Sequence, residues 1–340
     1  MKKVVECVPN FSEGKDKKKI RQIAGEIKKI KEAKLLDVSS DRDHNRTVIT
    51  FAGELEAVKR AAFLAIAKSC ELIDMASHKG EHPRIGACDI CPFVPISGVM
   101  MEECVNLARE LGAEIGESLG IPVYLYGEAA KLPERKNLAA IRSGEYEGLE
   151  EKLKDWQWQP DYGPAVFNKR AGATVIGARE LLIAFNVNLM AESKRAVDII
   201  SGLVRELGMT LISREGKKVR IPGVFKTVKA RGVFLKERGI YQVSMNLTNY
   251  KIVPPHEVFE TIKRVSPGLA EVLGSEIVGL VPKEAILMAG RFYLSSEASA
   301  KEDSPQENSE KKLIASAVKN LGLNSLKRFN PKKKIIEYLL

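Results

Sequence analysis

The sequence predicts an α+β protein made of two αβ subdomains. The chain has 340 residues, about the length of two ordinary domains. In each half, strands and helices follow a split βαβ, ferredoxin-like order, which places helices on the outer face of a mixed or antiparallel sheet. We assign residues 1–178 to an N-terminal subdomain, 179–296 to a C-terminal subdomain, and 297–340 to a mobile segment, a helix and a C-terminal tail.

The first half opens with a strand at 3–9, which runs into a loop containing Gly, Asn and Ser. A helix at about 16–32 follows, because isoleucines recur at helical spacing from Ile20 to Ile30. The next elements are strands at 34–38 and 47–53, a helix at 54–73, a loop rich in His, Lys and Gly at 77–86, a strand at 88–96, a helix at 100–119 and a strand at 123–126.

Residues 127–172 predict a long connection with only short helical pieces, since they are rich in Pro, Gly, Asn and charge. The second run of elements has strands near 173–177 and 181–189, a helix at 192–207, strands near 224–230 and 240–248, a helix at 255–264, a strand at 275–281 and a helix at 283–294. The polar segment 295–309 predicts mobility, and a helix at 310–321 precedes an apolar end.

Composition excludes collagen-like, disulfide-scaffold and wholly disordered chains, since 44% of the residues are hydrophobic and 29% charged. No run approaches the roughly 20 apolar residues of a membrane helix, and the N-terminus lacks a secretory signal, so we expect a cytoplasmic protein without membrane partners. The five cysteines are odd in number and the chain shows no export signal, so we expect reduced thiols. Cys88 and Cys91 point to opposite faces of a strand, which favours buried thiols over a metal site.

The net charge of +10 favours anionic partners. Most basic residues alternate with acidic ones, and no basic stripe interleaved with aromatics indicates nucleic-acid binding. Neither of the common glycine-rich nucleotide loops is present.

Histidine chemistry concentrates in the loop HKGEHPRIG, which holds His78 and His82. An imidazole titrates near neutrality, so His82 is a candidate proton carrier, although an exposed loop histidine is commonly incidental. His44 lies in a polar segment that reads as a solvated turn, and His256 lies at a predicted helix start, where a structural role is expected.

Amide side chains share one face on two strands of the second half. Asn186 and Asn188 lie on one side of their strand, and the corresponding side of the other strand holds Gln242, Ser244, Asn246 and Thr248. A solvent-facing sheet and a polar groove both fit this pattern. The glycine-, aromatic- and Lys/Arg-containing segment 161–174 can likewise be a linker or a loop that binds a flat anionic ligand.

Several longer motifs carry a family resemblance across the chain. They include VECVPNFSEG at 5–14, NRTVITFAGE at 45–54, HKGEHPRIGA at 78–87, PVYLYGEAA at 122–130, GATVIGARE at 172–180 and QVSMNLTNY at 242–250. Together they resemble the glutamate formimidoyltransferases. The resemblance implies transfer of a formimino group from N-formimino-L-glutamate to N5 of tetrahydrofolate, late in histidine degradation. It also implies a substrate groove between two sheets, a homodimer, no metal, and a separate cyclodeaminase that acts downstream.

The same resemblance assigns the site residues. It makes His82 the catalytic acid/base, and it places a folate-binding loop at Gly163, Pro164, Ala165, Val166, Phe167, Asn168, Lys169, Arg170, Ala171 and Gly172. Independently of the resemblance, side-chain geometry alone makes Arg46 and Arg84 candidates for pairing with the carboxylates of glutamate or of a polyglutamyl folate tail. Strand alternation makes Asn186, Asn188 and Asn246 further candidate substrate contacts.

One position departs from the family pattern. Animal members carry an acidic residue directly after LLDV, whereas this chain has Ser39. Either Asp37 or Asp41 supplies the carboxylate, or the proton follows a different path. The alternative reaction within the family is formyl transfer between 5-formyltetrahydrofolate and glutamate. Alternatives from another class are a non-catalytic folate-binding protein and a basic nucleic-acid-binding module.

Overall fold

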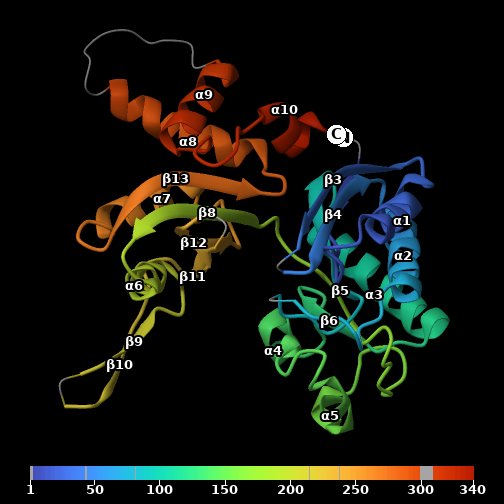
Figure 1. Ribbon diagram of the computed structural model, residues 1–340. Helices are drawn as coiled ribbons and strands as arrows, with labels where there is room; N and C mark the ends of the chain where they lie inside the picture. The colour runs from blue at the N-terminus through green and yellow to red at the C-terminus, as the bar shows by residue number, and fades with distance from the viewer. Residues whose placement is uncertain (1–2, 43, 81, 214, 237, 299–308) are drawn as a thin grey trace. The chain divides into compact units, whose positions relative to one another are not determined.

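A computed structural model describes residues 3–42, 44–80, 82–213, 215–236, 238–298 and 309–340 (Figure 1). The chain divides into two compact units, Met1–Glu180 and Leu181–Leu340. Each unit combines a main sheet with packed helices, so the predicted α+β class is confirmed.

The first unit contains a seven-stranded mixed sheet in the order β1-β4-β2-β5-β7-β6, with β3 paired to β4 and β1 also paired to β5. The pairs β5–β7 and β6–β7 are parallel, and the other pairs are antiparallel. Its strands are β1 (Val4–Cys7), β2 (Asn10–Phe11), β3 (Ala33–Asp41), β4 (Arg46–Gly53), β5 (Cys88–Ser97), β6 (Val123–Gly127) and β7 (Thr174–Ala178). β7 corrects one prediction, because the strand expected near 173–177 in the second run belongs to this first sheet.

Three helices share the main core of this unit: α1 (Lys17–Lys28), α2 (Leu55–Leu72) and α3 (Met101–Leu119). The side chain of Asp16 caps α1 by accepting from the amides of Lys18 and Lys19. The predicted stripe is buried from Ile20 to Ile27, whereas Ile30 follows the end of α1 and is partly buried. The connection 127–172 packs on the opposite face of β5, β6 and β7. As predicted, it holds only short helical pieces: η1 (Pro133–Lys136), α4 (Leu138–Arg142), α5 (Leu149–Lys154) and η2 (Trp156–Trp158).

The second unit has a four-stranded antiparallel sheet in the order β11-β12-β8-β13. The strands are β8 (Ile183–Ala191), β11 (Val228–Leu235), β12 (Ile240–Leu247) and β13 (Ala270–Val278), and α6 (Lys194–Val204) and α7 (Pro255–Val265) share their core. The order matches β3-β4-β1-β5 of the first unit. If the two-residue strand β2 is left out, the first strand of each run lies between the third and fourth: β1 between β4 and β5, and β8 between β12 and β13.

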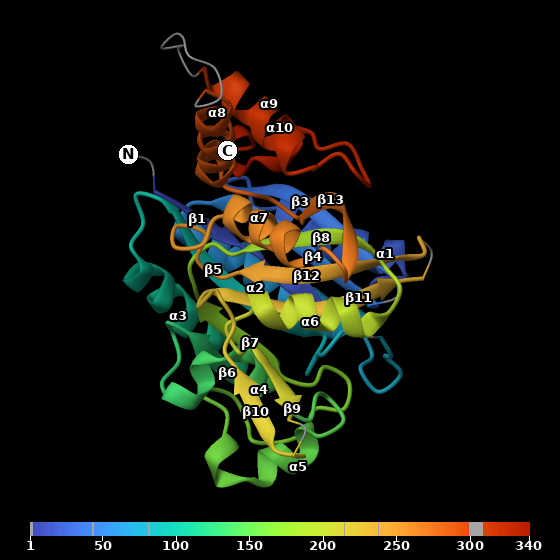
Figure 2. The same cartoon turned by 90° about the vertical axis from the view of Figure 1, so that its left-hand side faces the viewer.

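A hairpin in the second unit was not predicted. It consists of β9 (Met209–Ile212) and β10 (Lys218–Ile221), and it extends away from the four-stranded sheet of its own unit (Figures 1 and 2). Most of its side chains are exposed, so it lacks the buried apolar alternation from which a strand is recognised.

The C-terminal elements pack into the second unit. They are α8 (Lys283–Ala298), α9 (Glu310–Asn320), α10 (Pro331–Lys334) and η3 (Ile336–Tyr338), and Ile314 and Ala317 of α9 join the core. Residues 295–298, at the start of the predicted mobile segment, are helical, and residues 299–308 lie outside the described residues. None of the helices in the described ranges has both the length and the apolar character needed to cross a bilayer.

Candidate active site

Asn45 joins three loops at one end of the first unit's sheet. It lies in the β3–β4 turn with a left-handed backbone (φ +47°), which Asn tolerates better than most residues. Its Oδ1 accepts from the amide of Gly14 at 2.9 Å, and its Nδ2 donates to the carbonyl of Lys79 at 2.9 Å. The segment 10–14, the β3–β4 turn and the loop before β5 are therefore held together.

His82 lies on the last of these loops and is half-buried. Its Nε2 is 3.0 Å from Nη1 of Arg46, which also donates to Oδ1 of Asn10 at 3.2 Å. A guanidinium has donors only, so Nε2 of His82 is the acceptor and carries the lone pair. The structure thus brings together two predicted site residues, His82 and Arg46, and presents the imidazole in a form that can take up a proton.

His78 has a fixed structural role instead. It is buried, its Nδ1 accepts from Nε of Arg84 at 3.3 Å, and its Nε2 lies 3.0 Å from the carbonyl of Asn45. Because Nδ1 accepts, the ring proton is on Nε2 and is donated to that carbonyl. Burial lowers the pKa of His78, which keeps the ring neutral at physiological pH.

Arg84 is buried and engaged by two carboxylates. Its Nη1 lies 2.9 Å from Oε2 of Glu145 and 2.8 Å from Oε2 of Glu147, and its Nη2 lies 2.6 Å from Oε1 of Glu147. The hydrogen bond from Arg84 lowers the pKa of Glu147, and the same pairing raises the pKa of Arg84. The amide of Tyr146 also donates to the carbonyl of Arg84 at 2.8 Å. Arg84 thereby fastens the loop that carries His82 to the segment 144–147.

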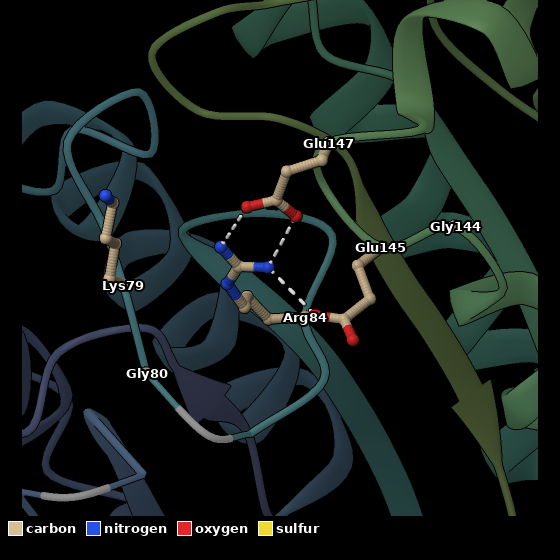
Figure 3. A pocket seen from close by; sticks show the side chains of 6 residues that line it. All are labelled: Lys79, Gly80, Arg84, Gly144, Glu145 and Glu147. Atoms are coloured by element: carbon tan, nitrogen blue, oxygen red, sulfur yellow. Dashed lines mark hydrogen bonds and ion pairs between the residues drawn. The ribbon is translucent and has the colours of Figure 1, made fainter.

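An open pocket of about 500 Å³ lies against these two segments (Figure 3). Its lining residues are Lys79, Gly80, Arg84, Gly144, Glu145 and Glu147. Lys79, Gly80 and Arg84 flank His82 on both sides in the sequence, although His82 itself is not one of the described residues that line the pocket. Figure 3 shows Lys79 on one side and the ion pairs of Arg84 on the other.

The predicted folate-binding loop is anchored at both ends by glycines with left-handed backbones, Gly163 (φ +76°) and Gly172 (φ +68°). A Cβ at Gly172 would stand 2.2 Å from the carbonyl oxygen of Ile85, so only glycine fits there. The amide of Ala173 donates to that carbonyl at 3.0 Å. The end of the loop therefore runs beside the residues that follow Arg84, while residues 163–166 are exposed.

The predicted amide residues belong to the second unit. Asn188 is fully buried and accepts at Oδ1 from Nε2 of Gln242 at 2.7 Å, and Asn186 donates to Oε1 of Glu276 at 3.0 Å. Strand register pairs Asn188 with Gln242, which confirms that the two amide-bearing strands share a polar face. Asn246 is exposed on β12.

The carboxylate candidates lie along β3. Asp41 accepts at Oδ1 from the amide of His44 at 2.7 Å and contacts Nδ1 of the same residue at 3.0 Å. It pairs in register with Arg46, whereas Asp37 pairs with Thr50, further from the turn. Of the two candidates, Asp41 is thus the one whose strand position adjoins Arg46.

The cysteines are free, and Cys88 and Cys91 are buried as predicted. Burial raises the pKa of the Cys88 thiol, and the contact with Cys7 together with burial raises the pKa of the Cys91 thiol. Within the described residues, no three His, Cys, Asp or Glu side chains gather as a metal-binding group.

Sequence reasoning missed Asn45, Glu145 and Glu147 as parts of this site. Asn45 follows His44 in the segment predicted to be a solvated turn, yet it is only 8% exposed. Glu145 and Glu147 are 61 and 63 residues from Arg84, and no local pattern reports such a pairing.

Comparison with known proteins bears on the whole chain. Residues 4–179 match the N-terminal subdomain of the formiminotransferase domain, and residues 184–340 match the formiminotransferase domain. The chain belongs to the formiminotransferase family. The resemblance inferred from the sequence motifs is thereby confirmed.

Named relatives support this membership. The chain is 46% identical over 341 residues to a formimidoyltransferase-cyclodeaminase of Mus musculus, in an alignment that covers 100% of this chain and 60% of that protein. It is 45% identical over 294 residues to a glutamate formimidoyltransferase of Thermoplasma acidophilum, covering 86% and 92% of the two chains. A glutamate formimidoyltransferase of Streptococcus pyogenes serotype M1 is 42% identical over 298 residues, covering 87% and 95%.

Proposed function

We propose that this chain is a glutamate formimidoyltransferase. It transfers the formimino group of N-formimino-L-glutamate to N5 of tetrahydrofolate and releases 5-formimidoyltetrahydrofolate and L-glutamate, a step of histidine degradation. The observation that carries the proposal is His82, held with its Nε2 lone pair towards Arg46 on a loop that adjoins the segment 163–172. Relatives of similar length named glutamate formimidoyltransferase support the same reaction.

The chemistry needs one group that both accepts and donates a proton. N5 of tetrahydrofolate attacks the formimino carbon, a C–N bond forms, and N5 loses its proton. The C–N bond to glutamate then breaks, and the departing glutamate nitrogen gains a proton. A neutral imidazole can take the first proton and return it in the second step, so His82 is assigned this role. Arg46 must first release Nε2, and its charge is then available to a substrate carboxylate.

The contacts of Arg84 favour a different role for this residue. Its guanidinium is already bound by two protein carboxylates, so we assign it to positioning the loop of His82 rather than to binding a substrate carboxylate. The loop 163–172 is assigned to tetrahydrofolate, with its exposed residues 163–166 offered to the co-substrate. Asn246, which is exposed, remains a proposed substrate contact. Asn186 and Asn188 are buried and hydrogen-bonded within their own unit, so we assign them to holding its polar sheet face together.

The proposal also includes cytosolic homodimers and a separate cyclodeaminase that closes the ring of the product. The chain spans 60% of the length of the mouse formimidoyltransferase-cyclodeaminase.

The test is turnover of tetrahydrofolate with N-formimino-L-glutamate. Acid quenching converts the product to methenyltetrahydrofolate, whose near-ultraviolet absorbance is read. Turnover supports the proposal. If folded, folate-binding protein gives no turnover with this donor but reacts with 5-formyltetrahydrofolate and glutamate, the formyl alternative replaces it.

A further inference from the structure

The pocket beside the His82 loop has two chemically different sides. Lys79, an exposed lysine, lies on one side, and Arg84 with Glu145 and Glu147 lies on the other (Figure 3). Among the described residues, the Lys79 ammonium has no recorded ion pair, and only its backbone carbonyl is engaged, by Asn45.

The charges on the second side do not cancel. Arg84 carries one positive charge and is paired with two carboxylates, so this side has a formal surplus of one negative charge. Glu147 is bound in a bidentate manner, whereas Glu145 contacts Arg84 through Oε2 alone. The side chain of Glu145 is 42% exposed and lines the pocket.

Glu145 is also held in an unfavourable backbone conformation, with φ +52°. Outside glycine, the left-handed region is sparsely populated, and residues kept there concentrate at functional sites. The amide of Glu145 donates to the carbonyl of Arg142 at 2.8 Å, which stabilises this turn.

The charges on the two sides of the pocket match N-formimino-L-glutamate better than N-formyl-L-glutamate. N-formimino-L-glutamate has two carboxylates and an amidine that is cationic at neutral pH. N-formyl-L-glutamate has the same carboxylates but a neutral amide. We propose that the pocket binds the glutamate donor, with Lys79 pairing with a carboxylate and Glu145 pairing with the cationic formimino group. This inference rests on the proposed function, and it makes Glu145 the residue that distinguishes formimino from formyl donors.

The experiment measures calorimetric dissociation constants of N-formimino-L-glutamate and N-formyl-L-glutamate in the absence of folate, for the full chain. Lys79→Met should weaken both ligands about tenfold, the order of one charge-assisted hydrogen bond. Lys79→Arg should restore most of the affinity. Glu145→Gln should weaken only the formimino ligand, by about fivefold or more. Lys28→Met and Glu117→Gln, at exposed helix positions of the same unit, are controls of equal charge change and should leave both constants unchanged.

Two results overturn the inference: unchanged binding of both ligands by Lys79→Met, or equal weakening of both ligands by Glu145→Gln. Turnover by the wild-type chain is measured in parallel. If the wild type turns over and the variants bind both ligands as the wild type does, the pocket assignment is rejected and the proposed function stands. If the variants lose binding as expected but the wild type shows no turnover, the proposed function is rejected and the pocket assignment stands.

Discussion

Acidification should destabilise the second unit through one buried imidazole, that of His256. This residue lies in the first turn of α7, is 7% exposed, and stacks on Phe292 with ring centroids 4.7 Å apart. Its Nδ1 is buried and has no hydrogen-bond partner in the described part of the chain. Burial lowers the pKa of His256 from 6.5 to about 4, because the charged ring would lose its hydration.

The sign and size of the effect follow from proton linkage. Between pH 6.5 and about 4 the unfolded chain binds a proton at His256 that the folded chain does not, so stability falls as the pH falls. Above pH 6.5 His256 is neutral in both the folded and the unfolded chain, so its contribution to the free energy of unfolding is fully present. On going from pH 8 to pH 5, these two pKa values correspond to a loss of about 2 kcal/mol in the free energy of unfolding.

The assay is urea unfolding followed by circular dichroism at pH 8, 7, 6 and 5, for the wild type and for His256→Phe. The variant keeps an aromatic ring against Phe292 but cannot titrate. His78, whose pKa is also lowered, is present in both proteins and cancels in the comparison. We expect the wild type to lose about 2 kcal/mol more than the variant between pH 8 and pH 5. Parallel pH dependences for the two proteins would refute the reasoning.

Single contacts in the first unit give three more expectations. Arg135→Met breaks a buried ion pair with Asp161 (3.0 Å) and should lower the free energy of unfolding by about 3 kcal/mol in urea titrations, with partial recovery on adding Asp161→Leu. Asn45→Ala removes two loop-joining hydrogen bonds and should cost about 2 kcal/mol by the same measurement; a cost near zero would contradict its joining role. Gly172→Ala should weaken tetrahydrofolate binding in fluorescence titrations, whereas Gly216→Ala, with φ +77° and no atom within 4 Å of a Cβ, should leave it unchanged.

The spacing of apolar and polar residues predicted which faces of individual helices and strands are buried. The isoleucine stripe of α1 is buried as its spacing indicates, and the amide face shared by β8 and β12 follows from strand alternation. The assignment of β7 to a sheet failed because its parallel partners, β5 and β6, are set by tertiary pairing rather than by neighbouring residues.

The site was predictable only in part. The loop with His82 was found from its residue types and from the family resemblance, but its supports were not. The pairing of Arg84 with Glu145 and Glu147 joins segments more than sixty residues apart, and the role of Asn45 depends on a left-handed turn that brings three loops together. Such contacts are fixed by packing, and no periodicity in the sequence encodes them.

The most direct test of the central claim is the acid-quench turnover assay on His82→Ala, with His44→Ala as the matched loop-histidine control. If His82 carries the proton, its removal should lower kcat by at least about a hundredfold and leave tetrahydrofolate binding intact, while His44→Ala stays near the wild type. A folded His82→Ala protein that turns over at the wild-type rate would contradict the role assigned to His82.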